Sequence, residues 1–170
     1  MKTGQFFLGV LATITCIVAL PAFASRYAAS PDGLEVSDSQ TGLIWRRCTE
    51  GMVWNGQTCT GTPLNITHSS AETRAEQEAK KDKKAWRLPT IPELKSLQAA
   101  GHPGALADPD AFPGTPEMWF WSVFIDKPGV IDAFNLYFGY HTAQLGDGRD
   151  NPYGAIRLVR TTHKASAKGK

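Results

Sequence analysis

Residues 86–94 read WRLPTIPEL, and this stretch predicts the point at which an extended chain turns into a helix. Thr90 can cap the helix, Pro92 is tolerated in its first turn, and Glu93 stands at the capping-box position. We therefore expect a helix that begins just after Thr90. It should be stopped by Gly101, which is soon followed by a proline.

Arg87, in the same stretch, admits two interpretations. As a functional residue it would bind an anionic group of a ligand. As a structural residue it would donate hydrogen bonds to backbone carbonyls or to a carboxylate, and Glu93 is close in sequence. We favour the structural interpretation, and we expect Trp86 beside it to belong to the core.

The residues before this corner predict a longer helix over residues 69–84. Ser69 and Glu72 have the spacing of a capping box, and Glu76 with Lys80 adds a favourable pair one turn apart. One narrow face carries only alanines: Ala71, Ala75 and Ala79. Small side chains would let this helix lie close to a sheet, and the charged remainder is expected to form a solvated face.

Alternating apolar and polar residues predict the strands. The expected strands are 34–38, 43–46, 119–124 and 156–160, with another strand or pair of strands within 130–145. Irregular chain is expected at 26–33, 101–116 and 146–152. No internal repeat is evident, and the length suits a single domain over residues 25–160.

The chain begins with the features of a secretory signal peptide. A lysine precedes an apolar run, and small residues lead to an expected cleavage site after Ala24. The apolar run is too short for a comfortable membrane span, so we expect an exported protein without a span after cleavage. The basic end, residues 161–170, is expected to be a solvated, flexible tail.

Charge argues against a nucleic-acid partner. The chain has 18 lysines and arginines against 16 aspartates and glutamates, with no clustered basic excess outside its end. A nucleic-acid-binding domain needs such a cluster on one face. The expected partners are therefore of other kinds.

Signal cleavage removes Cys16 and leaves Cys48 and Cys59. An even pair in an oxidising compartment predicts a disulfide. Between the two cysteines, Asn55-Gly56 is the strongest signal for a two-residue type I′ hairpin turn. We therefore expect the bridge to staple a small surface hairpin. A Cys-x-x-Cys redox or zinc motif is absent from the sequence.

Several separated stretches together resemble the Lcl C-terminal domain, a domain of unknown function at the C-terminus of a collagen-like adhesin. These stretches are 38–45, 48–61, 86–94, 111–122 and 156–160. The resemblance implies secreted or surface binding, with sulfated glycans as ligands of the best-known relative. It marks these structural motif positions: Trp45, Trp86, Arg87, Pro89, Thr90, Glu93, Trp121 and Arg157. The present sequence has no collagen-like repeat, so trimerisation is not implied.

The Arg-Leu-Pro-Thr element at residues 87–90, with Glu93 nearby, also looks like the formylglycine-generating and C-type-lectin-like group. That likeness implies an α+β fold: a single compact domain with two helices packed on a twisted antiparallel sheet and long loops on one face. A shared fold does not by itself give a function.

Aromatic residues supply the first candidates for ligand contact. Trp119 and Trp121 lie two apart, so they share one face of a strand, with Phe120 on the other. We expect Trp121 and Phe120 in the core. Trp119, Tyr137 and Tyr140 are the candidates for exposure, because flat rings can stack on the C–H faces of sugars.

Polar loop residues supply the other candidates. We hypothesise that residues 147–151, together with Tyr153 and His141, form the edge that faces the ligand, and Arg149 and Asp150 are the candidate contacts in this loop. Oxygen atoms in this loop would accept calcium, but its spacing is not that of an EF-hand, and its residues are ordinary turn formers. We therefore expect no cofactor.

The sequence shows no assembled catalytic motif. The four histidines do not pair at zinc spacing: His68, His102, His141 and His163. Our first hypothesis is a non-enzymatic recognition module that binds a polysaccharide or a cell-surface protein. The second is a structural subunit of an envelope or pilus assembly. The third is an enzyme related to the formylglycine-generating group, whose chemistry needs reactive cysteines or a metal.

Overall fold

The computed structural model describes residues 25–98, 107–123, 134–139, 142–147 and 150–161. The expected signal peptide and nearly all of the expected basic tail lie outside these residues. Within them, no helix is long and apolar enough to cross a membrane.

Four antiparallel strands form the first sheet, in the order β1-β2-β3-β9. They are β1 (Tyr27–Ala29), β2 (Glu35–Asp38), β3 (Leu43–Arg46) and β9 (Val159–Thr161). The two predicted strands at 34–38 and 43–46 are confirmed. The strand predicted at 156–160 begins three residues further along the chain than expected, because only residues from Val159 onward pair with β3.

Strand β1 shows that the prediction of an irregular arm over residues 26–33 was wrong. The arm is held by Arg26, whose Nε and Nη2 donate to the two carboxylate oxygens of Asp38 at 2.9 and 2.7 Å. The ring of Tyr27 also meets Phe112 edge-on, with centroids 5.2 Å apart. These contacts join residues distant in sequence, so local patterning did not reveal them.

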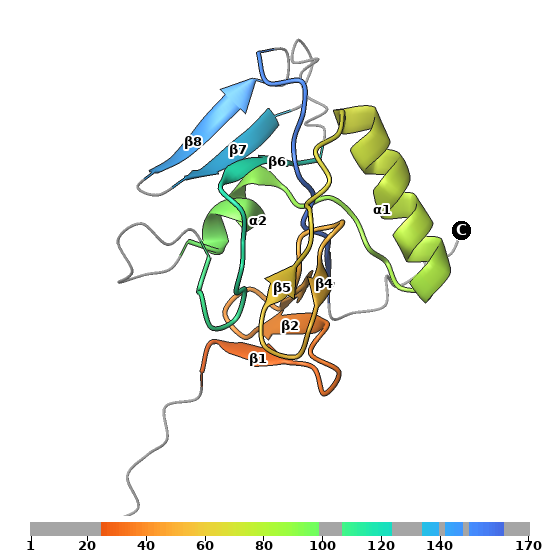
Figure 1. Ribbon diagram of the computed structural model, residues 1–170, viewed down its shortest axis with the longest axis vertical. Helices are drawn as coiled ribbons and strands as arrows, with labels where there is room; N and C mark the ends of the chain where they lie inside the picture. The colour runs from red at the N-terminus through yellow and green to blue at the C-terminus, as the bar shows by residue number, and fades with distance from the viewer. Residues whose placement is uncertain (1–24, 99–106, 124–133, 140–141, 148–149, 162–170) are drawn as a thin grey trace, which may run out of the picture.

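The other strands form a hairpin and a three-stranded sheet. The hairpin pairs β4 (Val53–Trp54) with β5 (Cys59–Thr60), and the sheet has the order β6-β7-β8. Its strands are β6 (Met118–Trp121), β7 (Phe134–Gly139) and β8 (Thr142–Asp147). In Figure 1 this sheet gathers at the end of the molecule opposite β1 and β2. One strand or a pair was expected within 130–145, and a pair is present; β8 continues to Asp147, so the first two residues of the loop expected at 146–152 belong to a strand.

Helix α1 spans His68–Asp82 and lies along one side of the molecule (Figure 1). Its N-cap is Thr67, whose hydroxyl accepts from the backbone of Ser70, so the prediction of Ser69 as the cap was wrong. The chain ahead of the cap is already held: Ile66 forms an antiparallel bridge with Gly154. That anchor places the first helical turn two residues earlier than expected.

Helix α2 spans Ile91–Ser96 and shows the predicted capping box between Thr90 and Glu93. Leu94 and the C-cap Leu97 are buried. The helix ends earlier than predicted, because its C-cap is Leu97.

Two clusters of buried side chains form the core. The first, between the four-stranded sheet and α2, includes Trp45, Leu94, Phe112 and Phe120. The second lies under α1 and consists of Ala71, Ala75, Trp86, Leu88, Trp121, Ile156 and Leu158. The predicted alanine face of the long helix therefore contacts the core, and both aromatic residues expected there, Phe120 and Trp121, are buried.

The segment at residues 154–159 separates the two clusters. Ala155 and Val159 belong to the first cluster, whereas Ile156 and Leu158 belong to the second. Ala155 also forms a parallel bridge with Phe120, and Val159 pairs with β3. The segment thus connects the sheets, and the protein is a single small α+β domain with two helices and antiparallel sheets, as predicted.

Candidate functional site

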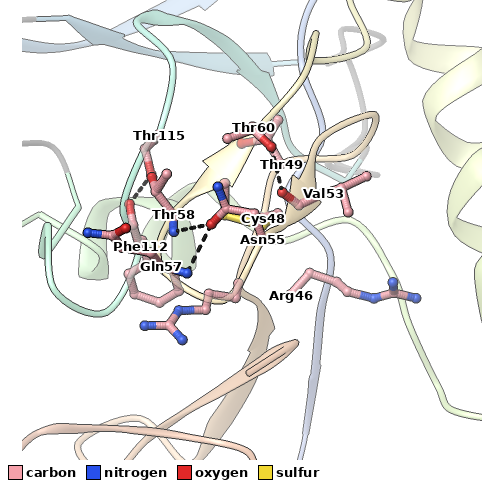
Figure 2. The surroundings of a disulfide bond; sticks show 12 residues. Arg46, Cys48, Thr49, Val53, Asn55, Gln57, Thr58, Thr60, Phe112 and Thr115 are labelled. Carbon is pink, nitrogen blue, oxygen red and sulfur yellow. Dashed lines mark hydrogen bonds between the residues drawn. A yellow bond between two sulfur atoms is a disulfide. The ribbon is translucent and has the colours of Figure 1, made fainter. Parts of the chain in front are cut away.

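A disulfide joins Cys48 to Cys59 and holds the β4–β5 hairpin against the domain (Figure 2). The predicted bridge and hairpin are both confirmed. The prediction of a two-residue turn was wrong, because Trp54 pairs with Cys59 and the loop between them has four residues, 55–58. The Asn55 side-chain oxygen accepts from the backbone N–H groups of Gln57 and Thr58 at 2.9 and 2.8 Å. These bonds stabilise the wider loop.

Arg157 fastens the start of the cysteine loop from inside. Only 2% of it is exposed, and it donates to the backbone carbonyls of Arg46 and Arg47. It also donates to the hydroxyls of Thr49 and Thr115, at 3.3 and 2.7 Å. Burial lowers the pKa of this guanidinium. Arg157 therefore links three segments, and no part of it faces solvent enough to serve as a ligand site.

Arg87 is engaged at the corner before α2. Its Nη1 and Nη2 donate to the two carboxylate oxygens of Glu93 at 2.8 and 2.7 Å. Burial alone would raise the pKa of Glu93, but the bonds from Arg87 and from the Thr90 backbone hold that pKa below its usual value. The other motif positions lie inside the domain: Trp45, Trp86, Pro89 and Trp121.

Trp119 and Tyr137 are the two predicted ligand residues that the structure brings together. They are opposite partners on β6 and β7, with ring centroids 5.2 Å apart and planes tilted by 55°. Both side chains are partly exposed. We call them the aromatic pair. Each ring is carried by a residue of a paired strand. A ligand could therefore contact this aromatic surface without a loop first becoming ordered.

The remaining predicted ligand residues are not brought to one point. Asp150 and Tyr153 are exposed in the connection that leads into Ala155. The other three lie outside the described residues: Tyr140, His141 and Arg149. In the described part of the chain, no group of three or more His, Cys, Asp or Glu side chains could hold a metal ion. The expectation that residues 147–151 form an ordinary turn without a cofactor stays a prediction, since two residues of that loop are not described.

A pocket of about 290 Å³, which we call the hairpin pocket, lies between the β4–β5 hairpin and α1. Its lining includes two buried carboxylates, Glu50 and Glu78. Arg74 joins them, with Nε 3.0 Å from Glu50 and Nη2 2.9 Å from Glu78. Arg46 donates to the other carboxylate oxygen of Glu78 at 2.8 Å, and the same nitrogen also donates to Asp82. The charged floor of the pocket is therefore an ordered network.

Sequence reasoning missed this network. Glu78 lies in the charge run of α1, which predicted a solvated face, and that prediction was wrong at this position because Glu78 is buried. The available signal was the i,i+4 spacing of Arg74 and Glu78. The contribution of Glu50 could not be read from spacing, because it reaches the helix from the cysteine loop.

Apolar side chains form the rim of the hairpin pocket. Val53 is 67% exposed and Leu34 is 47% exposed, among the most exposed large apolar side chains of the described residues. Trp54 also lines the pocket, and the guanidinium of Arg47 lies 3.8 Å from its ring centre. A Cβ on Gly33 would lie 2.4 Å from the Trp54 ring nitrogen, so the indole is packed closely from that direction too.

Comparisons with known proteins add one finding. A family model described as the Lcl C-terminal domain matches residues 34–160, which is most of the chain. The match includes the hairpin, both helices, the aromatic pair and the segment that carries Arg157. No curated protein and no solved structure matches the chain.

Proposed function

We propose, from the premise that this chain belongs to the Lcl C-terminal domain family, that it is an exported recognition module without enzymatic activity. It binds a polysaccharide or a cell-surface protein as part of an adhesin-like role. The aromatic pair forms the centre of its contact surface. Asp150 and Tyr153, which are exposed and follow the three-stranded sheet in the sequence, are further candidate contacts.

The aromatic pair is the observation that supports this proposal best. The backbone of Trp119 is held by two neighbours. It pairs with Tyr137 on β7, and its carbonyl accepts a 2.7 Å hydrogen bond from the Ala155 N–H. Two rings held this firmly contribute contact area with little loss of side-chain entropy on binding. Sugar C–H faces and apolar protein side chains both pack on such surfaces.

The disulfide supports the expectation of export. Disulfides persist in secreted and periplasmic proteins and are rare where thiols are kept reduced. The same bridge bears on the enzyme hypothesis, because that chemistry would draw on reactive cysteines or a metal, and Cys48 is joined to Cys59. Free-thiol titration of the native protein tests this: two reactive thiols would favour the enzyme.

The test of the binding proposal is a glycan array probed with the purified mature protein, with and without calcium. We expect binding that does not need calcium and that falls at least tenfold, roughly 1.4 kcal/mol, in Trp119→Ala. Trp119→Phe, which keeps a ring, should retain most of it, and Lys80→Ala, at an exposed position of α1, should retain all of it. Glycan binding that is equal in wild type and Trp119→Ala would refute the role of the pair.

A structural subunit would give a different result. In that case the protein would be recovered from native envelopes in a stable hetero-complex and would show no glycan affinity. The array and the purification together therefore distinguish the two hypotheses.

A further inference from the structure

We propose that the hairpin pocket is a second binding site, which takes the C-terminal carboxylate of a polypeptide that ends in an aliphatic residue. The carboxylate would meet the arginines at the floor, and the last side chain would pack on the rim. This site shares no residue with the aromatic pair and does not depend on the function proposed for it.

Charge at the pocket favours an anionic group. Three cations line the pocket, Arg46, Arg74 and Lys81, against two buried carboxylates, Glu50 and Glu78. The side chain of Lys81 is 71% exposed and that of Arg74 is 35% exposed. Arg46 is the least exposed of the three, because it also pairs with Asp82 and lies over the ring of Trp86. Arg74 uses Nε and Nη2 for Glu50 and Glu78. Arg46 uses Nη2 for both Glu78 and Asp82. Among the described residues, the Nη1 of Arg74 and the Nε and Nη1 of Arg46 donate to no protein acceptor. Guanidinium N–H groups left free in this way suit a carboxylate.

The rim distinguishes a peptide from a sugar. Exposed aliphatic groups, chiefly Val53 and Leu34, stand beside the cations, and burying them against an aliphatic side chain removes apolar area from water. A sugar would instead need a free aromatic face. Trp54, the only aromatic residue of the lining, has one face against Arg47 and its ring nitrogen against Gly33. The chemistry of the rim is therefore that of an aliphatic binding site.

Size sets the extent of the ligand. The volume of about 290 Å³ lies at the lower end of the range for ligand pockets, which is roughly 300–1,000 Å³. Such a space suits one or two residues, and capture of a terminal carboxylate is an established way to bind a chain end. The disulfide between Cys48 and Cys59 keeps the wall of the pocket in position before the ligand arrives.

Fluorescence polarisation tests the proposal with a fluorescein-labelled pentapeptide that ends in Val-Leu with a free carboxylate. Its matched probes are the same peptide with an amidated end and one that ends in Gly-Gly. We expect saturable binding of the first peptide and at least tenfold weaker binding of the other two. No binding of the free-carboxylate peptide, or equal binding of the amidated one, would overturn the proposal.

Two exposed variants and two matched controls locate the site. Lys81→Ala and Val53→Ser should each weaken the peptide by about three- to tenfold. Lys80→Ala, whose side chain is 79% exposed on the same helix, and Tyr153→Ser, 56% exposed elsewhere, should leave it unchanged. Equal effects of Lys80→Ala and Lys81→Ala would show general charge attraction and overturn the site.

Two further measurements separate this site from the aromatic pair and from sugars. Trp119→Ala should keep full peptide affinity whether or not it binds glycans, so failure of one proposal leaves the other standing. A uronic acid monosaccharide that displaced the peptide at equal or lower concentration than the unlabelled peptide would identify a sugar site instead.

Discussion

Removal of the disulfide should lower the stability of the domain by an amount that follows from the loop it closes. Cys48 and Cys59 are 11 residues apart, and for a loop of that length the chain-entropy relation gives about 3 kcal/mol. In a domain of this size, each kcal/mol lowers the melting temperature by about 2–4 °C. We therefore expect Cys48→Ser to melt about 6–12 °C below the oxidised wild type.

The fold itself should persist in this variant. The hairpin keeps its strand pairing and the Asn55 bonds, and Arg157 still holds the start of the loop through the Arg46 carbonyl and Thr49. Far-ultraviolet circular dichroism should therefore be unchanged at low temperature. Only the unfolded chain gains freedom, which is the origin of the loss in this account.

Differential scanning calorimetry measures the effect, and two controls isolate it. Cys48→Ala/Cys59→Ala removes both sulfurs without leaving a free thiol, and reduced wild type keeps both. All three proteins should melt at similar temperatures. A variant that melts with the oxidised wild type would show that the bridge does not constrain the unfolded chain, and the reasoning above would fail.

Three further outcomes are expected. Glu93→Ala removes the Arg87 pair and the bond from the Thr90 N–H, while the Thr90 hydroxyl still caps the helix, and it should cost about 1–3 kcal/mol in urea unfolding; a loss no larger than that of Lys95→Ala would contradict this. Asp38 and Glu93 have lowered pKa values, so their stabilisation is present above about pH 4 and is lost as pH falls through their folded pKa values; Asp38→Asn should flatten the acid side of the stability curve, and an unchanged curve would refute the assignment. Gly33→Ala and Gly42→Ala both strain a positive φ, at 72° and 68°, but only the first places a Cβ against Trp54; Gly33→Ala should unfold at the lower urea concentration and alter Trp fluorescence.

The parts of the fold that could be predicted from sequence depend on short-range chemistry. The start of α2 needs only Thr90, Pro92 and Glu93, which are within one turn of each other. The hairpin needs two cysteines and an intervening turn signal. In both cases the interacting groups are neighbours in the chain, so residue type and spacing carry most of the information.

The errors occurred where distant residues decide between local alternatives. Thr67 and Ser69 could each cap α1, and the choice depends on how the preceding residue is held. The carbonyl of Ile66 accepts from the Trp121 ring nitrogen at 2.6 Å, and its backbone pairs with Gly154. Strand β1 likewise forms because Arg26 reaches Asp38. Neither contact has a local sequence pattern.

The candidate site divides in the same way. Pairing of Trp119 with Tyr137 follows from two strands in register, and both residues were candidates from their type alone. The hairpin pocket could not be predicted, because its charges come from β3, the cysteine loop and α1. The sequence of α1 alone gives no sign that Glu78 differs from the exposed glutamates of the same helix. Its burial becomes visible only when Arg46 and Arg74 are placed on either side of it.

Arg157 explains why these distant parts act as one unit. All five residues at 155–159 are buried, and their apolar side chains belong to one core cluster or the other. The polar residue among them, Arg157, is therefore placed inside the domain. The guanidinium resolves this by donating to the carbonyls of Arg46 and Arg47, the residues that lead into the disulfide. Arg46 also lines the hairpin pocket. Arg157 therefore helps to position the pocket, although the two residues are 111 apart in sequence. The pocket is thus a product of the whole fold rather than of the hairpin alone.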